Sequence, residues 1–558
     1  MSAQSGDTLP RSSTPGRSWR NDILFTAVVL VVATVVLSWC ATQTADVLDQ
    51  DYKNVVSTIT LGVAGLLLAG WYWSRSSLPR LAKWLVPLVG LVILVACIRF
   101  EDFTADMRFQ LAWRFMPRPD QRLPQAETEV AMEATRGNVG RDHDYPRFLG
   151  ADGRATVENV ALATDWKNNP PRLLWRQPIG AGWSAFSIVG DYAITQEQRG
   201  ADELVVCYER KTGRIVWSHQ DKTRFQEVLG GIGPRATPTV DDDRVYTQGA
   251  TGLLNCLQLT SGRPIWTRDI LTDNSATQIQ WGRSGSPLIV DDKVVVSAGG
   301  PNGRSLVAYN KWTGQPTWSA GNDQSSYASP VLATLAGRRQ VVTVNEDHVR
   351  GHDVEDGRPL WSFPWPGDSS ADANTSQPVP LGDDRVFVSK GYLQGCALFE
   401  IRTSNHDNFT AHLLWRSHKS LKTKMTNVVV YQDHLYGLSG GILECVQIEG
   451  LKRKWKRGRY GHGQLLLVGG LLLITSEQGE LVLVRATPQR HEELAKFQAL
   501  EGKTWNNPAL AGPYLLVRNH LEAACYQLPV LAKKSAAKKT TNKDHGAGTE
   551  SKGPNPWK

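Results

Sequence analysis

The sequence of 558 residues is poor in cysteine, and its cysteines are not arranged as a metal or redox site. The seven cysteines include no CxxC pair, and no group of Cys and His has the spacing of a zinc site. Cys207, Cys256, Cys445 and Cys525 occupy the same place in a repeat that is described below. Equivalent places in neighbouring repeats should lie too far apart for disulfides, so we predict small buried core residues.

The sequence also lacks a basic stripe interleaved with aromatic residues. The formal net charge is +8, but the segment from Leu531 to the end carries seven lysines against Asp544 and Glu550. Most of the positive charge therefore belongs to this tail, and the rest of the chain is close to neutral. This distribution argues against a nucleic-acid partner. Because the tail (residues 531–558) is rich in lysine and poor in apolar residues, we predict that it is disordered.

Long hydrophobic runs are absent except in the first hundred residues, where three occur at residues 23–42, 55–73 and 81–98. Each approaches the length of about 20 residues that crosses a bilayer. A cleaved signal peptide is the alternative for the first run, but a long polar leader precedes it and two further runs follow. We therefore predict a leader at residues 1–22 and an α-helical membrane anchor of three spans at residues 23–98.

The placement of Lys and Arg predicts the orientation of this anchor. The leader and the second short loop are basic, whereas the first loop is acidic; the basic residues are Arg11, Arg17, Arg20, Arg75, Arg80 and Lys83. By the positive-inside rule the leader is cytoplasmic. After three spans, everything beyond Arg99 lies outside the cytoplasm. We predict a multi-pass protein of the cytoplasmic (inner) membrane with its large domain on the periplasmic, extracytoplasmic side.

Residues 99–142 are predicted to form a juxtamembrane amphipathic segment and a linker. Phe100, Phe103, Met107, Leu111 and Phe115 recur every three or four residues, which is the spacing of one helix face. The predicted helix would lie on the outer membrane surface or pack against the following domain. Residues 117–140 are rich in Pro, Glu and Arg and are typical of a linker.

A motif of eleven residues recurs through residues 143–530. Its clearest copy runs from Ala308 to Trp318, with a strand, a turn at Gly314 and a second strand that ends in tryptophan. Similar copies end at Trp217, Trp266 and Trp361. A period of about 40 to 50 residues built from short strands is the signature of propeller blades.

The repeats predict an all-β, eight-bladed β-propeller of four-stranded antiparallel blades, with seven blades as the alternative. Seven units precede residue 498, and residues 506–528 supply three more strands. The missing outer strand of the eighth blade would be Leu173-Leu174-Trp175. Both ends of the array would then complete one blade, which removes an open sheet edge.

The motif resembles the tryptophan-docking repeat, Ala-x-Asp-x-x-x-Gly-x-x-x-Trp, of the pyrroloquinoline-quinone (PQQ)-binding-like propeller family. Ala308–Trp318 has Asn310 in place of the Asp, and Gly351–Trp361 keeps Asp353. The family includes quinoprotein alcohol dehydrogenases and the non-catalytic propeller lipoprotein of the outer-membrane β-barrel assembly machinery. A propeller behind three spans is most similar to membrane-anchored members in planctomycete bacteria.

The resemblance implies a fold, whereas the residues that carry the family's activity do not transfer. Quinoprotein dehydrogenases of this type hold the quinone between a tryptophan and a disulfide of adjacent cysteines, and they bind Ca²⁺ beside an Asp base. This sequence contains no Cys-Cys pair. No Asp or Glu maps onto the calcium or base positions. We therefore assign no catalytic residue, no metal and no cofactor, and PQQ with calcium enters only under an enzymatic alternative.

Residues just before or at the start of each predicted inner strand should meet at one mouth of the central channel. This series contains three cations and no acid, which favours an anionic or sugar-like ligand; its members are Arg235, Arg283, Tyr327, Gln377, Lys424, His462, Trp505 and Asn506. Convergent polar groups in a concavity are typical of a binding site. The alternative is that these polar side chains face a wet channel and bond neighbouring backbone.

Three functions follow from these features. The first is a binding or scaffold module, tethered outside the cytoplasmic membrane, for a protein or an envelope polymer. The second is a quinone-dependent oxidoreductase, in which the cationic mouth would hold the quinone carboxylates. The third is a ligand sensor that signals through its spans. The anchor and the missing cofactor residues favour the first.

Overall fold

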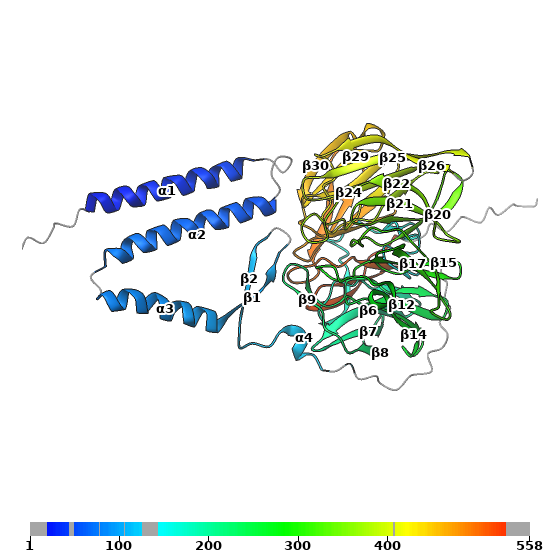
Figure 1. The fold of residues 1–558 in the computed structure, drawn as a ribbon, viewed down its shortest axis with the longest axis horizontal. Coiled ribbons are helices and arrows are strands. Elements are labelled where there is room, and N and C mark those ends of the chain that lie inside the picture. The colour runs from blue at the N-terminus through cyan, green and yellow to red at the C-terminus, as the bar shows by residue number, and fades with distance from the viewer. Residues whose placement is uncertain are drawn as a thin grey trace, which may run out of the picture.

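The computed structural model describes residues 19–43, 50–76, 79–104, 107–124, 126, 143–405 and 408–531. Three N-terminal helices lead through a β-hairpin into a large propeller (Figure 1). The predicted leader, much of the predicted linker and the predicted lysine-rich tail lie largely outside the described residues.

The propeller has eight four-stranded antiparallel blades, as the repeat predicted. The first strands of several neighbouring blades contact one another, so the first strands form the inner ring. From inner to outer strand, the first four blades are β5 (Ser187–Val189), β6 (Tyr192–Arg199), β7 (Asp202–Glu209) and β8 (Ile215–Asp221); β11 (Thr239–Asp241), β12 (Arg244–Gln248), β13 (Leu253–Gln258) and β14 (Pro264–Asp269); β15 (Leu288–Val290), β16 (Lys293–Gly300), β17 (Arg304–Asn310) and β18 (Pro316–Ala320); β19 (Val331–Leu335), β20 (Arg338–Val344), β21 (His348–Asp353) and β22 (Pro359–Pro364).

The last four blades have the same order, and the eighth is completed by a strand from the start of the domain. They are β23 (Val379–Leu381), β24 (Arg385–Lys390), β25 (Gly395–Asn405) and β26 (Asn408–Ser417); β27 (Val429–Tyr431), β28 (His434–Ser439), β29 (Ile442–Gln447) and β30 (Arg453–Arg459); β31 (Gln464–Val468), β32 (Leu471–Thr475), β33 (Glu480–Arg485) and β34 (Glu493–Gln498); β35 (Ala509–Ala511), β36 (Tyr514–Arg518), β37 (Glu522–Gln527) and β4 (Arg172–Pro178). Short elements between blades are β9 (Gln226–Glu227), β10 (Gly231–Ile232) and α5 (Ile270–Asn274), and the 3-10 turn Glu449–Leu451 joins β29 to β30 within the sixth blade.

The ring closes as the sequence predicted, because β4 pairs with β37 and places Trp175 opposite Cys525. The buried Arg518 of the eighth blade strengthens this closure. Its guanidinium donates to the Thr195 hydroxyl at 2.8 Å and to the Gly180 carbonyl at 2.8 Å. The two ends of the array are thereby joined through the backbone and through a side chain, and no outer strand of the eighth blade is missing.

The tryptophan motif works by docking each blade onto the next. The Trp217 indole Nε1 donates to the Leu259 carbonyl at 2.8 Å, and its ring covers Gly262 in the turn of the second blade. Gly262 has φ of +67°, and a Cβ there would lie 2.3 Å from the ring. The motif therefore needs glycine both for the left-handed turn and for the close approach of the ring.

The same docking repeats around the propeller, and it places the cysteines in the core. Trp175, Trp266, Trp318 and Trp455 donate to carbonyl groups of the next blade at 2.8 to 3.1 Å. Cys207, Cys256, Cys445 and Cys525 lie opposite the docking tryptophans of their own sheets and are buried and free. This confirms that they are small core residues.

The three N-terminal helices are α1 (Trp19–Thr42), α2 (Gln50–Ser74) and α3 (Arg80–Cys97). Residues 21–42 of α1 and the whole of α2 are long and apolar enough to cross a membrane. The apolar part of α3, Leu81–Cys97, is shorter than either. Three predicted helical segments are therefore present, and two of them meet the criteria for a membrane span.

The prediction of an amphipathic helix after the anchor is wrong. Residues 98–113 form a β-hairpin of β1 (Ile98–Phe103) and β2 (Phe109–Trp113), followed by the short α4 (Pro119–Arg122). The aromatic residues explain the difference, because Phe100, Phe103 and Phe109 cluster across the two strands with ring centroids 4.8 to 6.3 Å apart. Aromatic side chains favour strands, and this cross-strand packing outweighs the helical spacing.

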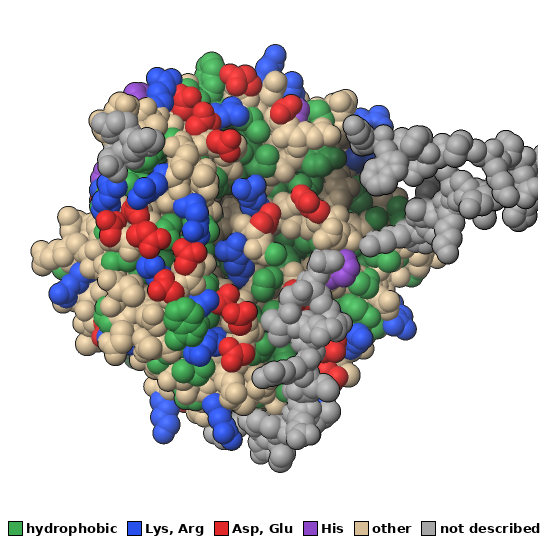
Figure 2. Space-filling model, turned by 90° about the vertical axis from the view of Figure 1, so that its right-hand side faces the viewer, with side chains coloured by type: hydrophobic (Ala, Val, Ile, Leu, Met, Phe, Trp, Pro, Cys, Tyr) green, Lys and Arg blue, Asp and Glu red, His purple; other side chains and the backbone are tan. Residues whose placement is uncertain are grey.

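The segment that follows residue 143 closes the channel at the end away from the helices. Tyr145 pairs with Ile188 of β5, and β3 (Thr156–Val157) adds in parallel to β31 at Leu467 and Val468. These partners lie at the ends of the inner strands that are farthest from the predicted mouth. The face opposite the helices carries acidic and basic side chains interspersed (Figure 2).

Candidate functional site

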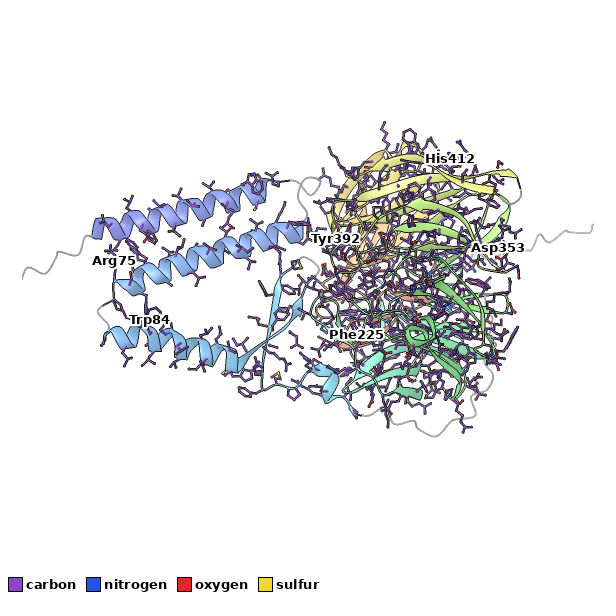
Figure 3. All side chains as sticks on the ribbon, in the orientation of Figure 1. Arg75, Trp84, Phe225, Asp353, Tyr392 and His412 are labelled. Atoms are coloured by element: carbon purple, nitrogen blue, oxygen red, sulfur yellow. The ribbon has the colours of Figure 1, made fainter. Side chains whose placement is uncertain are left out.

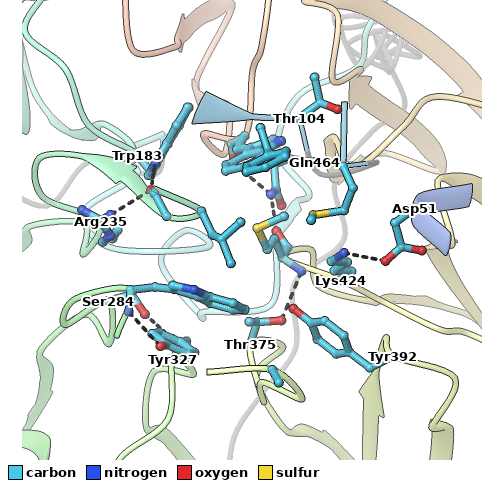
Figure 4. A pocket seen from close by; sticks show the side chains of 18 of the residues that line it. Asp51, Thr104, Trp183, Arg235, Ser284, Tyr327, Thr375, Tyr392, Lys424 and Gln464 are labelled. Atoms are coloured by element: carbon cyan, nitrogen blue, oxygen red, sulfur yellow. Dashed lines mark hydrogen bonds and ion pairs between the residues drawn. The ribbon is translucent and has the colours of Figure 1, made fainter. Parts of the chain in front are cut away.

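A cavity of about 470 Å³ lies at the mouth of the channel that faces the helices (Figure 4). Loops that lead into the inner strands form most of its wall, which explains why their side chains converge. The first turns of α2 and the tip of the β1–β2 hairpin complete the wall from the other side. Phe148, from the segment that closes the far end of the channel, also reaches this cavity. Phe225 and Tyr392 lie on the helix-facing side of the propeller (Figure 3).

Aromatic pairs dominate the part of the wall that the propeller contributes. The rings of Trp281 and Tyr327 stack with centroids 5.1 Å apart and an interplanar angle of 22°. The rings of Trp183 and Trp505 are 4.7 Å apart, from loops of the first and eighth blades. The Trp281 amide donates to the Tyr327 hydroxyl at 3.1 Å, and burial raises the pKa of this tyrosine. These contacts fix broad flat surfaces around the cavity.

The N-terminal helices and the hairpin contribute polar contacts as well as apolar wall. The Lys424 ammonium forms an ion pair with the Asp51 carboxylate of α2 at 3.1 Å, and it also lies 5.1 Å from the Tyr392 ring. The Lys503 ammonium donates to the Phe103 carbonyl of β1 at 3.2 Å. Helix α2 and the β1–β2 hairpin are thus both tied to the propeller at its mouth.

Four of the eight predicted site residues line the cavity: Arg235, Tyr327, Lys424 and Trp505. Arg235 packs over the Phe225 ring at 4.3 Å and donates to the carbonyls of Gly230 and Gly231. Burial lowers the pKa of this arginine to about 10. Trp505 donates from Nε1 to the Glu477 carboxylate at 3.1 Å.

The other four predicted residues do not line this cavity. Arg283 is buried, and its guanidinium donates to the Ser325 hydroxyl and the Thr277 carbonyl. Asn506 donates to the carbonyls of Gly182 and Ser184, and so joins the eighth blade to the first. Gln377 faces two hollows beyond the channel mouth. His462 lines a separate small hollow that also contains Asp51 and Lys424. All four lie in loops before their strands, and no residue-type pattern in the sequence indicated which loop side chains face the cavity.

The prediction of a mouth with cations and no acid is also wrong. Asp51 neutralises Lys424, and it lies 373 residues earlier in the chain. Glu477 accepts from Trp505 and from the His462 amide at 3.0 Å. The guanidinium of Arg235 is satisfied by backbone carbonyls. The mouth therefore has internally paired charges in an aromatic wall, and its electrostatics do not favour an anion.

Sequence reasoning missed Trp281, Tyr392 and Met425 among the lining residues. Trp281 lies two residues before Arg283 and, like Trp183, in a loop that leads toward an inner strand. This position before an inner strand is the feature from which Trp281 could have been predicted as a lining residue. The contribution of Asp51, Val55 and Met107 had no signal in the sequence, because it depends on how α2 and the β1–β2 hairpin pack against the propeller.

Several buried polar atoms of the wall have no hydrogen-bond partner among the described residues. They are the Trp281 Nε1, the Tyr392 hydroxyl, the Gln464 Oε1 and the Asn507 Nδ2. Gln464 is only 2% exposed and Asn507 is 8% exposed, so these two side chains are held away from bulk water. The Gln464 Nε2, in contrast, donates to the carbonyls of Met425 and Trp505.

The residues of the mouth do not fit the quinone of the quinoprotein dehydrogenases, whose repeat this sequence resembles. Three carboxylates require cations with free hydrogen-bonding capacity. Among the described lining residues, the cations are Arg235 and Lys424, which already bind backbone carbonyls and Asp51. No group of three or more His, Cys, Asp or Glu in the described part of the chain is placed to hold a metal ion.

Comparison with known proteins agrees with this fold. Residues 201–457 match the model of the family described as outer membrane protein assembly factor BamB. No curated protein matches the chain. The crystal structure of BamB from Moraxella catarrhalis has 14% identity and a TM-score of 0.46, and the alignment covers 64% of this chain and 98% of that one.

Two quinohemoprotein alcohol dehydrogenases are similar in structure. The enzyme from Comamonas testosteroni has 12% identity and a TM-score of 0.52, over 71% of this chain and 82% of that chain. ADHIIG from Pseudomonas putida HK5 has 12% identity and a TM-score of 0.51, over 70% of this chain and 81% of that chain. At these identities the likeness concerns the fold. The matching repeats, the eight blades and the docking tryptophans show that the chain has the fold of a PQQ-like β-propeller.

Proposed function

We propose that this protein is a binding module, anchored in the cytoplasmic membrane, that holds a protein or envelope ligand at the mouth of an extracytoplasmic propeller. The mouth cavity carries the proposal, because the anchor and the propeller build it together. Asp51 and Phe103 hold the anchor side of the wall against Lys424 and Lys503. A largely preformed concavity with a few placed polar groups is typical of a ligand site.

The arrangement of the helices supports their proposed role as a membrane anchor. The end of α1, the start of α2 and the end of α3 all point toward the propeller (Figure 1). Arg75 lies at the far end of the helices, and Trp84, which is 80% exposed, projects from α3 (Figure 3). Exposed apolar side chains along helices are typical of lipid contact. We take α3 as a third, shorter span, with the basic loop after α2 in the cytoplasm.

The oxidoreductase alternative has less support at the site. The quinohemoprotein dehydrogenases resemble this chain in fold, and fold alone does not carry an activity. The paired charges of the mouth do not suit a tricarboxylated quinone, as described above. A binding role requires only the cavity and its hydrogen-bonding groups.

Photo-crosslinking in the native cell tests this proposal. Tyr392 is replaced by the photoreactive residue benzoylphenylalanine, which preserves an aromatic ring in the cavity wall. The matched control carries the same residue at Trp312, an exposed side chain on the turn of the third blade. After irradiation, the purified full-length chain is examined by intact mass.

We expect a discrete added mass at position 392 and none at position 312. The class of the adduct, protein, polymer or lipid, is read from its mass and from its sensitivity to protease, glycosidase or lipase. A chain that acquires no adduct at position 392, or equal adducts at both positions, would overturn the binding role of the cavity.

A further inference from the structure

We propose that the mouth cavity takes an uncharged amphiphile from the outer leaflet of the membrane that anchors the chain. This inference rests on the proposed binding function and names the ligand class. It draws on three features of the molecule: the apolar wall, the paired charges and the position of the cavity beside the anchor.

The wall offers an apolar body its main contact surface. Trp183, Trp281, Leu229 and Met425 line the propeller side, and Val55 and Met107 line the anchor side. Burying apolar area releases about 25 cal/mol for each Å² removed from water. Met side chains adapt to irregular apolar shapes. A hydrocarbon chain would therefore fit this wall better than a purely polar sugar.

The charges of the mouth disfavour a charged head. Lys424 is paired with Asp51, and Arg235 donates to backbone carbonyls. An anionic head would have to displace one of these partners, and the displaced Asp51 would then lie unpaired beside it. An uncharged head requires no such rearrangement.

The position of the cavity indicates that the ligand comes from the membrane. The same α2 that supplies Val55 continues into an apolar helix, and the same hairpin that supplies Met107 exposes large apolar side chains. The exposed residues of the hairpin are Phe109, Leu111 and Trp113, and the equally exposed Phe115 and Met116 follow it. Aromatic and apolar side chains of this kind favour the membrane interface. An amphiphile in the outer leaflet would thus lie next to the mouth.

Tryptophan quenching tests this inference, because bromine atoms quench an indole at contact distance. The full-length chain is placed in lipid nanodiscs that contain a small fraction of a monoacylglycerol with a brominated acyl chain. Ala371→Phe fills the cavity, since Ala371 is exposed in its wall and its side chain makes no hydrogen bond. Ala201→Phe is the matched control on an exposed turn outside the cavity. Circular dichroism checks that both variants fold.

Lipid-exposed tryptophans such as Trp84 give a background of quenching that rises in proportion to any brominated lipid. Above this background we expect a component that saturates at a low fraction of the monoacylglycerol, is lost in Ala371→Phe and is retained in Ala201→Phe. Brominated phosphatidylglycerol should give no such component at the same fraction. Absence of a saturating component with the monoacylglycerol, or an equal one with the anionic lipid, would overturn the inference. A protein or polymer adduct at position 392 would also overturn it while leaving the proposed binding function standing.

Discussion

Replacement of Trp217 by alanine should destabilise the propeller strongly, because this side chain joins the first two blades. Trp217 is 1% exposed, its Nε1 donates to the Leu259 carbonyl at 2.8 Å, and its ring packs on Gly262. A buried Trp→Ala change costs about 3–5 kcal/mol through lost burial and the cavity left behind. A propeller of this size has an unfolding entropy of about 0.8 kcal/mol per kelvin, so Tm should fall by about 5 °C.

The assay is thermal unfolding of the full-length chain in nanodiscs, followed by circular dichroism in the strand region. Trp312→Ala is the matched control, because Trp312 is 48% exposed and removal of an exposed side chain changes stability by about 0.5 kcal/mol or less. Trp318 is only partly buried, so its replacement should cost less than that of Trp217. Equal Tm values for the Trp217 and Trp312 variants would refute the docking role of the motif.

Three further predictions concern the mouth and its surroundings. Asp51→Asn should increase hydrogen exchange in residues 50–55 without changing the Tm of the propeller, because it breaks the ion pair with Lys424; unchanged exchange would mean that the pair does not hold α2. PQQ with Ca²⁺ should give no stoichiometric binding in calorimetry, whereas a one-to-one complex that reduces a dye with alcohol would contradict the paired charges described above. Burial raises the pKa of Glu203 to about 7, above its ordinary value of 4.5, so the folded state binds the extra proton and stability should fall as pH rises from about 4.5 to 7. Glu203→Gln should remove about 3–4 kcal/mol of this decline, since each pKa unit between 4.5 and 7 is worth about 1.4 kcal/mol; an unchanged pH profile of chemical unfolding would contradict the assignment.

The blades could be predicted from the sequence because their signals are local. Ala308–Trp318 contains its own strands, its turn glycine and its docking tryptophan within eleven residues. The closure by residues 173–175 could be predicted too, because an incomplete last blade needs a fourth strand, and β4 supplies it. These features depend on spacing and turn chemistry, which a single sequence carries.

The mouth could be predicted only in part, because it depends on side-chain direction and on distant packing. Arg235 and Arg283 precede inner strands of adjacent blades, yet one lines the cavity and the other bonds Ser325 and Thr277 in the core. The pair of Asp51 and Lys424 joins residues 373 positions apart. The β1–β2 hairpin was missed because its aromatic spacing also fits a helix, and cross-strand packing decides between the two.

The most direct test of the shared cavity is an experimental density map of the full-length chain in nanodiscs made from native membrane lipid. We expect density for a bound molecule between Trp281, Tyr392 and Trp505, with Asp51 of α2 in contact with Lys424. A map in which α2 lies away from the propeller, or in which the mouth is collapsed or holds only water, would contradict the account.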